Sequence, residues 1–214
     1  MEPTDHNRRV WDEIHRNRAA GREGQLGIPD PIRTHLRDVT GRHVLHVQCG
    51  SGEATAELVE LGALVTAVDD SAESIETARK RAPDVAYLVA DVHALPIELR
   101  RGRFDVVYAG GAVVERLDDP EAWAGGVVSA LRSPGTLVFH DHHPISWGID
   151  DSMRWRGDYF ADDSPPGLGR IVTALIDAGL EVQLLEEYPS STLYPWLHQS
   201  PHVPREFLLI AAKP

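Results

Sequence analysis

Short apolar runs alternate with segments of mixed polarity along most of the chain. Five such runs lie at residues 44–47, 64–68, 85–89, 104–108 and 136–139. Each run has the length of a buried strand. Apolar residues recur at helical spacing between the later runs, as at Trp123, Val127 and Leu131. Strands that alternate with helices are typical of a parallel sheet with right-handed crossovers.

The last two apolar runs, 180–185 and 207–211, have no helical segment between them, and the linker 186–206 is rich in proline. We therefore expect these two runs to pair as antiparallel strands at one edge of the sheet. The sequence predicts an α/β fold: a Rossmann-like, doubly wound, mostly parallel seven-stranded sheet with an antiparallel last strand.

Residues 1–40 have a different pattern from the rest of the chain. Within them, residues 6–20 carry a few apolar side chains at helical spacing, and glycines and prolines follow. We expect an N-terminal helical cap segment at 1–40 and the Rossmann-like domain at 41–214, as a single domain overall.

A glycine turn and three acids mark the edge of the sheet where such folds bind ligands. Cys49, Gly50, Ser51 and Gly52 follow the first predicted strand and open a helix. Asp69 ends the second strand, about 20 residues later, where an acid can bind ribose hydroxyls. Asp70 and Asp91 follow the second and third strands. The alternative is a plain strand-to-helix turn with solvated acids.

The glycine pattern does not match that of a dinucleotide site, which needs G-x-G-x-x-G. Gln48 occupies the first glycine position, Thr55 and not a glycine lies three residues beyond Gly52, and no Gly-Lys-Ser/Thr of a P-loop follows. Helix N-terminal amides after the turn can still receive a carboxylate. The sequence therefore favours a ligand without phosphates.

Several segments, taken in order, resemble the class I S-adenosylmethionine-dependent methyltransferases over roughly residues 40–143. They are Val44-Leu45-His46-Val47-Gln48-Cys49-Gly50-Ser51-Gly52, Val65-Thr66-Ala67-Val68-Asp69-Asp70-Ser71, Ala90-Asp91-Val92, Phe104-Asp105-Val106-Val107 and Leu131-Arg132-Ser133-Pro134-Gly135. Many members have an acid at the position of His46 and a glycine at that of Gln48. The chain is similar here to a bacterial small-molecule subgroup with a Leu-His-Leu-Gln-Cys type first motif, and also at Asp141-His142-His143-Pro144 and Phe207-Leu208-Leu209.

The resemblance implies S-adenosyl-L-methionine as cofactor and S-adenosyl-L-homocysteine as product. It implies that the loop residues Gln48, Cys49, Gly50, Ser51 and Gly52 lie against the methionine part. Asp69, with Asp70 beside it, would bind the ribose, and Asp91 and Val92 would flank the adenine. Residues 109–111, with Ala109 and Gly110 among them, would pass beside the sulfonium and the substrate.

The cluster His140-Asp141-His142-His143 follows the fifth predicted strand, at the ligand-binding edge. A histidine titrates near neutrality and can accept a proton, and an adjacent carboxylate can fix its tautomer. We expect His143, Asp141 and His140 to be catalytic; the alternative is that they cap the strand and bind loops. Strand alternation sends His140 and His142 to one side and Asp141 and His143 to the other, so no metal site is predicted.

The acceptor pocket has no readable motif. Trp11 and His15 lie one helical turn apart in the N-terminal segment, which in similar proteins folds over the cofactor. With Glu115 and Trp147 they are the candidate substrate-binding residues. The alternative is that these side chains pack against the domain or, for Glu115, face solvent.

The net charge of the chain limits the classes of partner that we expect. Lys and Arg number 21 against 33 Asp and Glu, a formal net charge of −12. Nucleic acids and anionic membranes need clustered cations, so we expect neither as partner. The single cysteine and a start without the pattern of a secretory signal favour a cytoplasmic protein.

We therefore expect an enzyme that transfers a methyl group from S-adenosylmethionine to an oxygen or nitrogen of a small molecule, such as a secondary metabolite. The alternative is a fold relative that binds the cofactor without methyl transfer, such as a cyclase or a binding subunit. A nicotinamide-dependent oxidoreductase is disfavoured by the missing third glycine. The oligomeric state stays open, with a homodimer as one expectation.

Overall fold

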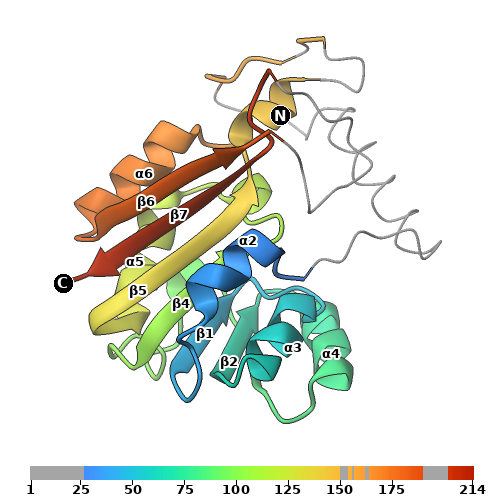
Figure 1. Ribbon diagram of the computed structural model, residues 1–214, viewed down its shortest axis with the longest axis vertical. Helices are drawn as coiled ribbons and strands as arrows, with labels where there is room; N and C mark the ends of the chain where they lie inside the picture. Colours follow the sequence, from blue (N-terminus) through green and yellow to red (C-terminus); the bar gives the residue numbers. More distant parts are fainter. Residues whose placement is uncertain (1–26, 150–153, 156, 162–163, 190–201) are drawn as a thin grey trace.

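The computed structural model describes residues 27–149, 154–155, 157–161, 164–189 and 202–214. Within them, seven strands form one sheet in the order β3-β2-β1-β4-β5-β7-β6 (Figure 1). The strands are β1 His43–Val47, β2 Leu64–Asp69, β3 Ala86–Val89, β4 Phe104–Gly110, β5 Leu131–His142, β6 Glu181–Tyr188 and β7 Glu206–Lys213. This confirms the predicted seven-stranded Rossmann-like fold.

Strands β1 to β5 pair in parallel, whereas β7 is antiparallel to both β5 and β6. The predicted antiparallel pair at one edge is confirmed, with β6 outermost. The strand order reverses between β1 and β4, so the carboxyl ends of β1 and β4 flank the switch point where such sheets bind ligands.

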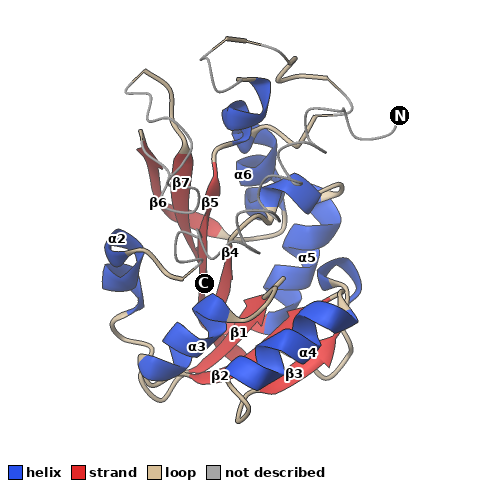
Figure 2. Cartoon of the chain, turned by 90° about the vertical axis from the view of Figure 1, so that its right-hand side faces the viewer, coloured by secondary structure: helices blue, strands red, loops and turns tan. Residues whose placement is uncertain are grey.

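Helices cover both faces of the sheet (Figure 2). The α-helices are α2 Asp30–Arg33, α3 Glu53–Glu60, α4 Ala72–Arg81, α5 Pro120–Ala130 and α6 Leu168–Asp177. Short 3-10 turns are η1 Thr34–Leu36, η2 Val92–Ala94, η3 Val114–Arg116 and η4 Pro144–Gly148. Because both faces are covered, all seven residues of the central strand β4 are buried.

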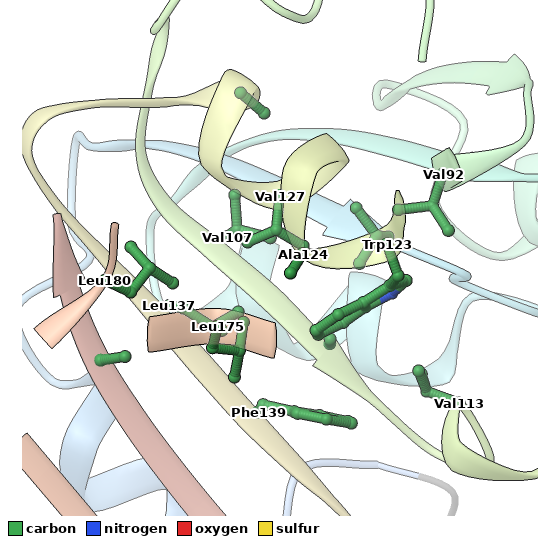
Figure 3. Packing of buried hydrophobic residues seen from close by; sticks show 14 of the residues in the cluster. Val92, Val107, Val113, Trp123, Ala124, Val127, Leu137, Phe139, Leu175 and Leu180 are labelled. Atoms are coloured by element: carbon green, nitrogen blue, oxygen red, sulfur yellow. The ribbon is translucent and has the colours of Figure 1, made fainter. Parts of the chain in front are cut away.

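The core is divided by the sheet into two layers. Val107 and Ala109 of β4 face α5 and α6, where Trp123 and Phe139 pack with ring centroids 5.0 Å apart (Figure 3). The alternate β4 residues belong to the opposite layer, under α2 and α3. The period of two along the strand thus sets which residues can reach the ligand edge from each face.

Two boundaries differ from the prediction. Leu131, expected on the helix of α5, begins β5, because its backbone is extended (φ −67°, ψ 132°). Strand β5 continues past the apolar run at 136–139 to His142, since β7 pairs with it over that length. No helix in the described part of the chain is long and apolar enough to cross a bilayer.

The expected cap segment 1–40 lies partly outside the described residues. Its described end contains α2 and η1, which pack on the core through Ile32 and Leu36. Glu57 of α3 fixes the start of this piece: its carboxylate accepts from the Ile28 backbone at 2.8 Å and from Arg33 at 2.5 Å. Residues 27–36 are therefore anchored to the domain.

Candidate functional site

The turn after β1 is the first component of the site. Gln48, Gly50 and Gly52 all have positive φ, at 52°, 52° and 85°. A Cβ on Gly52 would lie 2.8 Å from the Ala78 Cβ, so only glycine lets α4 approach the turn this closely. The turn then opens directly into α3, whose first backbone amides point toward the ligand edge.

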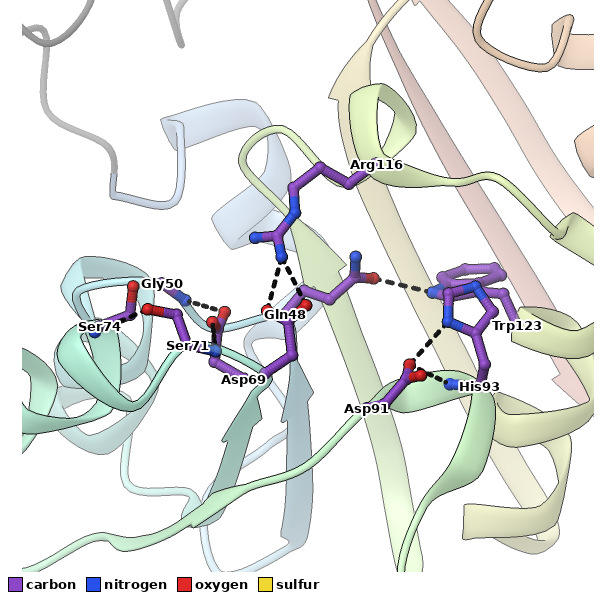
Figure 4. A network of polar contacts seen from close by, with 10 residues as sticks. Gln48, Gly50, Asp69, Ser71, Ser74, Asp91, His93, Arg116 and Trp123 are labelled. Atoms are coloured by element: carbon purple, nitrogen blue, oxygen red, sulfur yellow. Dashed lines mark hydrogen bonds and ion pairs between the residues drawn. The ribbon is translucent and has the colours of Figure 1, made fainter. Parts of the chain in front are cut away.

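Asp69, at the end of β2, holds the turn in place. Its carboxylate accepts from the Gly50 backbone N–H at 2.9 Å and from the Ser71 backbone N–H at 2.9 Å (Figure 4). Asp69 is 2% exposed. Each carboxylate oxygen has two lone pairs, so both oxygens can accept a further bond from a ligand hydroxyl.

Two cavities lie along this edge. The loop cavity, of about 620 Å³, is lined by the turn after β1, the end of β2, the start of α4 and residues 110–112. The acidic cavity, of about 400 Å³, is lined by the ends of β2 and β3 and by η3. Gln48 and Arg116 line both cavities, so the two adjoin there. Volumes of this size suit a cofactor-sized ligand.

Most of the charged side chains in both linings are carboxylates. The loop cavity has Glu53, Asp69 and Glu73; the acidic cavity has Asp70, Asp91, Glu115 and Asp118. Among the described residues, Arg116 is the one arginine or lysine that lines either cavity, and its guanidinium is paired with Asp70 at 2.5 and 2.7 Å. This charge repels phosphates and favours a ligand that carries positive charge.

The acids and the cysteine of the predicted cofactor site occupy defined positions. Asp91 lines the acidic cavity, and the backbone N–H of His93, at 2.9 Å, holds the pKa of its carboxyl below the usual value. Burial raises the pKa of the Cys49 thiol to about 12, so Cys49 lines the loop cavity as a neutral group. Val92 lines the acidic cavity beside Asp91.

The loop after β4 closes the opposite side of the loop cavity. Gly110 lines the cavity, whereas Ala109 is buried against α5 and lines neither cavity. Gly111 and Ala112, both with positive φ, line it as well. Gly111 belongs to the segment 109–111 expected beside the sulfonium, whereas Ala112 was not among the predicted site residues. The signal in the sequence is weak, because only Gly111 reveals a turn there.

Asp141 is fully buried behind this loop. Its carboxylate accepts backbone N–H groups from Ala112 at 3.0 Å, Val113 at 2.5 Å, Val114 at 3.1 Å and His142 at 2.7 Å. Four donors occupy the carboxylate, and Asp141 lines neither described cavity. These contacts hold the backbone of residues 112–114 in place, and the catalytic role expected for Asp141 stays a prediction.

The three histidines of the cluster each lie against a carboxylate. His140 Nε2 is 2.9 Å from Glu206, His143 Nε2 is 2.9 Å from Glu187, and His142 Nδ1 is 3.5 Å from Glu115. His143 Nδ1 also accepts from the Ile145 backbone at 3.1 Å. Neither His140 nor His143 lines a described cavity, an arrangement that matches the alternative of strand-capping histidines.

His46 was not among the predicted site residues, yet it lines the loop cavity. Its Nδ1 lies 2.8 Å from Thr55 Oγ1, and burial lowers its pKa to about 3. The imidazole is therefore neutral at physiological pH. The unusual histidine in the first motif thus adds no charge to the cavity.

The structure does not bring the predicted substrate-binding residues together. Glu115 lines the acidic cavity, while Trp147 lies half-buried in η4 and lines neither described cavity. Trp11 and His15 lie outside the described residues. No group of three His, Cys, Asp or Glu side chains within the described ranges is arranged to hold a metal ion.

The strand order, the glycine turn and the acids after β2 and β3 match the Rossmann-like fold of S-adenosylmethionine-dependent methyltransferases. Residues 45–139 match the family described as methyltransferase domain. A crystal structure of an S-adenosylmethionine-dependent methyltransferase from Mesorhizobium loti superposes with a TM-score of 0.70 at 25% identity, covering 85% of this chain and 95% of that one.

Curated relatives share the same region. Ubiquinone biosynthesis O-methyltransferase from Coxiella burnetii is 28% identical over 56% of this chain and 53% of that protein. The enzyme of that name from Xanthomonas oryzae is 31% identical over 60% of this chain and 54% of that protein. The chain thus matches about half the length of these relatives. The comparisons support a class I methyltransferase with S-adenosylmethionine as cofactor.

Proposed function

We propose that this protein binds S-adenosylmethionine across the loop cavity and the acidic cavity and transfers the methyl group to an oxygen or nitrogen of a small molecule. The observation that carries the proposal is the pair of adjoining cavities at the switch point, lined by carboxylates and by a glycine turn without a phosphate cradle. S-adenosylmethionine carries two cationic groups and no phosphate, which fits this lining.

The residues present fit the parts of that cofactor. Backbone amides at the start of α3 suit the methionine carboxylate, and Asp69 retains lone pairs for the ribose hydroxyls. Asp91 and Val92, in the acidic cavity, suit the adenine. These positions support the binding roles expected from the resemblance.

The bound cofactor supplies an electrophilic methyl group for an in-line displacement. This chain's own contribution is to hold the acceptor in line and to exclude water. Gly110, Gly111 and Ala112 form the wall of the loop cavity at the end of β4, and Asp141 fixes the backbone that follows. A rigid wall at this place supports catalysis by positioning.

The acceptor class follows from charge and from the relatives. A net charge of −12 opposes a polynucleotide acceptor. The curated relatives are named O-methyltransferases of ubiquinone biosynthesis, which supports an oxygen on a small molecule as the first class to test.

The test uses S-adenosylmethionine labelled in its methyl group, with a panel of catechols, phenols and amines beside transfer RNA and a protein mixture. We expect label in a small molecule, together with S-adenosylhomocysteine. Binding of the cofactor without transfer to any of them would favour the alternative of a cofactor-binding relative, such as a cyclase or a binding subunit. Label in RNA or protein would contradict the acceptor class.

A further inference from the structure

Gln48 occupies a backbone conformation that favours glycine. Its φ of 52° lies in the left-handed region, which side chains rarely adopt. Such a residue persists where the surrounding structure holds it, often at a ligand site. A glycine at this position would relieve the strain but would have no side chain. The contacts of the Gln48 side chain therefore indicate what it contributes.

The side chain of Gln48 makes one defined contact in the core. Its Oε1 accepts from Trp123 Nε1 of α5 at 3.0 Å (Figure 4). Trp123 is fully buried, and an indole N–H can only donate. The amide is therefore oriented: its oxygen faces Trp123, and its NH₂ group lies on the other side.

The amide lies where the two cavities adjoin, because Gln48 and Arg116 are the described residues that line both. Figure 4 shows the amide nitrogen turned away from Trp123, on the side of Arg116. A ligand that spans both cavities must pass this point. If the amino-acid part of S-adenosylmethionine lies at the turn after β1 and its adenine lies in the acidic cavity, the nucleoside half of the cofactor adjoins the Gln48 amide.

The resemblance implies a place for Gln48 against the methionine part, but we propose that Gln48 is a preorganised hydrogen-bond donor to an oxygen or ring nitrogen of the cofactor's nucleoside half, with Trp123 fixing its orientation. This inference rests on the proposed function. Fixing the donor before binding lowers the entropy lost on binding. It also accounts for a glutamine at a position where a glycine would be unstrained.

The decisive variant is Gln48→Glu. A carboxylate of the same shape still accepts from Trp123, but its second oxygen presents an acceptor in place of the donor. The matched control is Gln183→Glu, which makes the same change on the exposed side of β6. The probes are S-adenosylhomocysteine and 5′-methylthioadenosine. Both have no net charge, so the added negative charge has little long-range effect on either.

Calorimetry should show that Gln48→Glu weakens both probes by a similar factor, about 10-fold or more, while Gln183→Glu leaves both unchanged. Gln48→Gly relieves the positive φ but leaves the buried Trp123 N–H without this acceptor. It should also weaken both probes, and a cooperative unfolding transition should show that the variant is folded. Weakening of S-adenosylhomocysteine alone would overturn the assignment to the nucleoside half. Unchanged affinity for both would show that Gln48 serves only Trp123. Failure of the wild-type protein to bind any such ligand would refute the proposed function itself.

Discussion

Replacement of Asp141 by asparagine tests whether one buried carboxylate builds the wall of the site. The variant keeps one carbonyl oxygen and replaces the other with an NH₂ group. In the structure, Ala112 and His142 donate to Oδ1, while Val113 and Val114 donate to Oδ2. Whichever way the amide turns, two backbone N–H groups lose their acceptor and face another donor.

The expected loss of stability follows from these contacts. A buried donor left without a partner costs about 1–3 kcal/mol, and Asp141 is fully buried. Two such donors give a loss of about 2–6 kcal/mol in the free energy of unfolding. For a chain of this size that lowers the melting temperature by roughly 4–24 °C.

Urea denaturation of the wild-type protein and Asp141→Asn measures the difference directly. The control is Asp119→Asn, the same change at the exposed N-cap of α5, where the carboxylate accepts from the Ala122 backbone at 2.9 Å. Asparagine caps a helix as well as aspartate does, so the control should stay within about 0.5 kcal/mol. A loss below about 1 kcal/mol for Asp141→Asn would refute the reasoning.

Two further predictions concern the packing and the titration of the site. Gly126→Ala should destabilise the protein by about 1–3 kcal/mol, because its Cβ would lie 2.2 Å from the Val92 carbonyl oxygen. The control Gly125→Ala should be neutral or stabilising, since no atom lies within 4 Å of its Cβ. Equal effects of the two substitutions in urea denaturation would contradict this prediction. Burial holds the pKa of His46 at about 3, so below pH 6.5 the unfolded chain binds a proton that the folded chain does not, and stability falls with falling pH. His46→Asn should lose less stability between pH 6.5 and 4.5, by up to about 1.4 kcal/mol per pH unit; parallel slopes for the two proteins would show that His46 is not held neutral.

The parts of the fold that rest on local pattern could be predicted from the sequence. Apolar runs located the strands, and the glycine turn with Asp69 located the loop cavity, because both signals lie within a few residues. The end of β5 could not be predicted in this way. His140 and His142 are polar yet buried there, since carboxylates from β7 and η3 lie against them.

The roles of individual side chains depended on contacts between distant parts of the chain. Asp141 fitted the pattern of a catalytic acid beside histidines, but its partners are backbone amides 27–29 residues away and the adjacent His142. The Gln48 contact with Trp123 spans 75 residues. No periodicity or motif encodes such pairs, so only the folded arrangement reveals them.

The central claim is that the two adjoining cavities bind S-adenosylmethionine. Calorimetric titration of the purified protein with S-adenosylmethionine and, separately, with NADH tests it most directly. We predict saturable binding of S-adenosylmethionine alone, weakened about 10-fold or more in Asp69→Ala, because Asp69 both holds the turn through Gly50 and lines the loop cavity. Binding of NADH, or no binding of S-adenosylmethionine by the folded protein, would contradict the account.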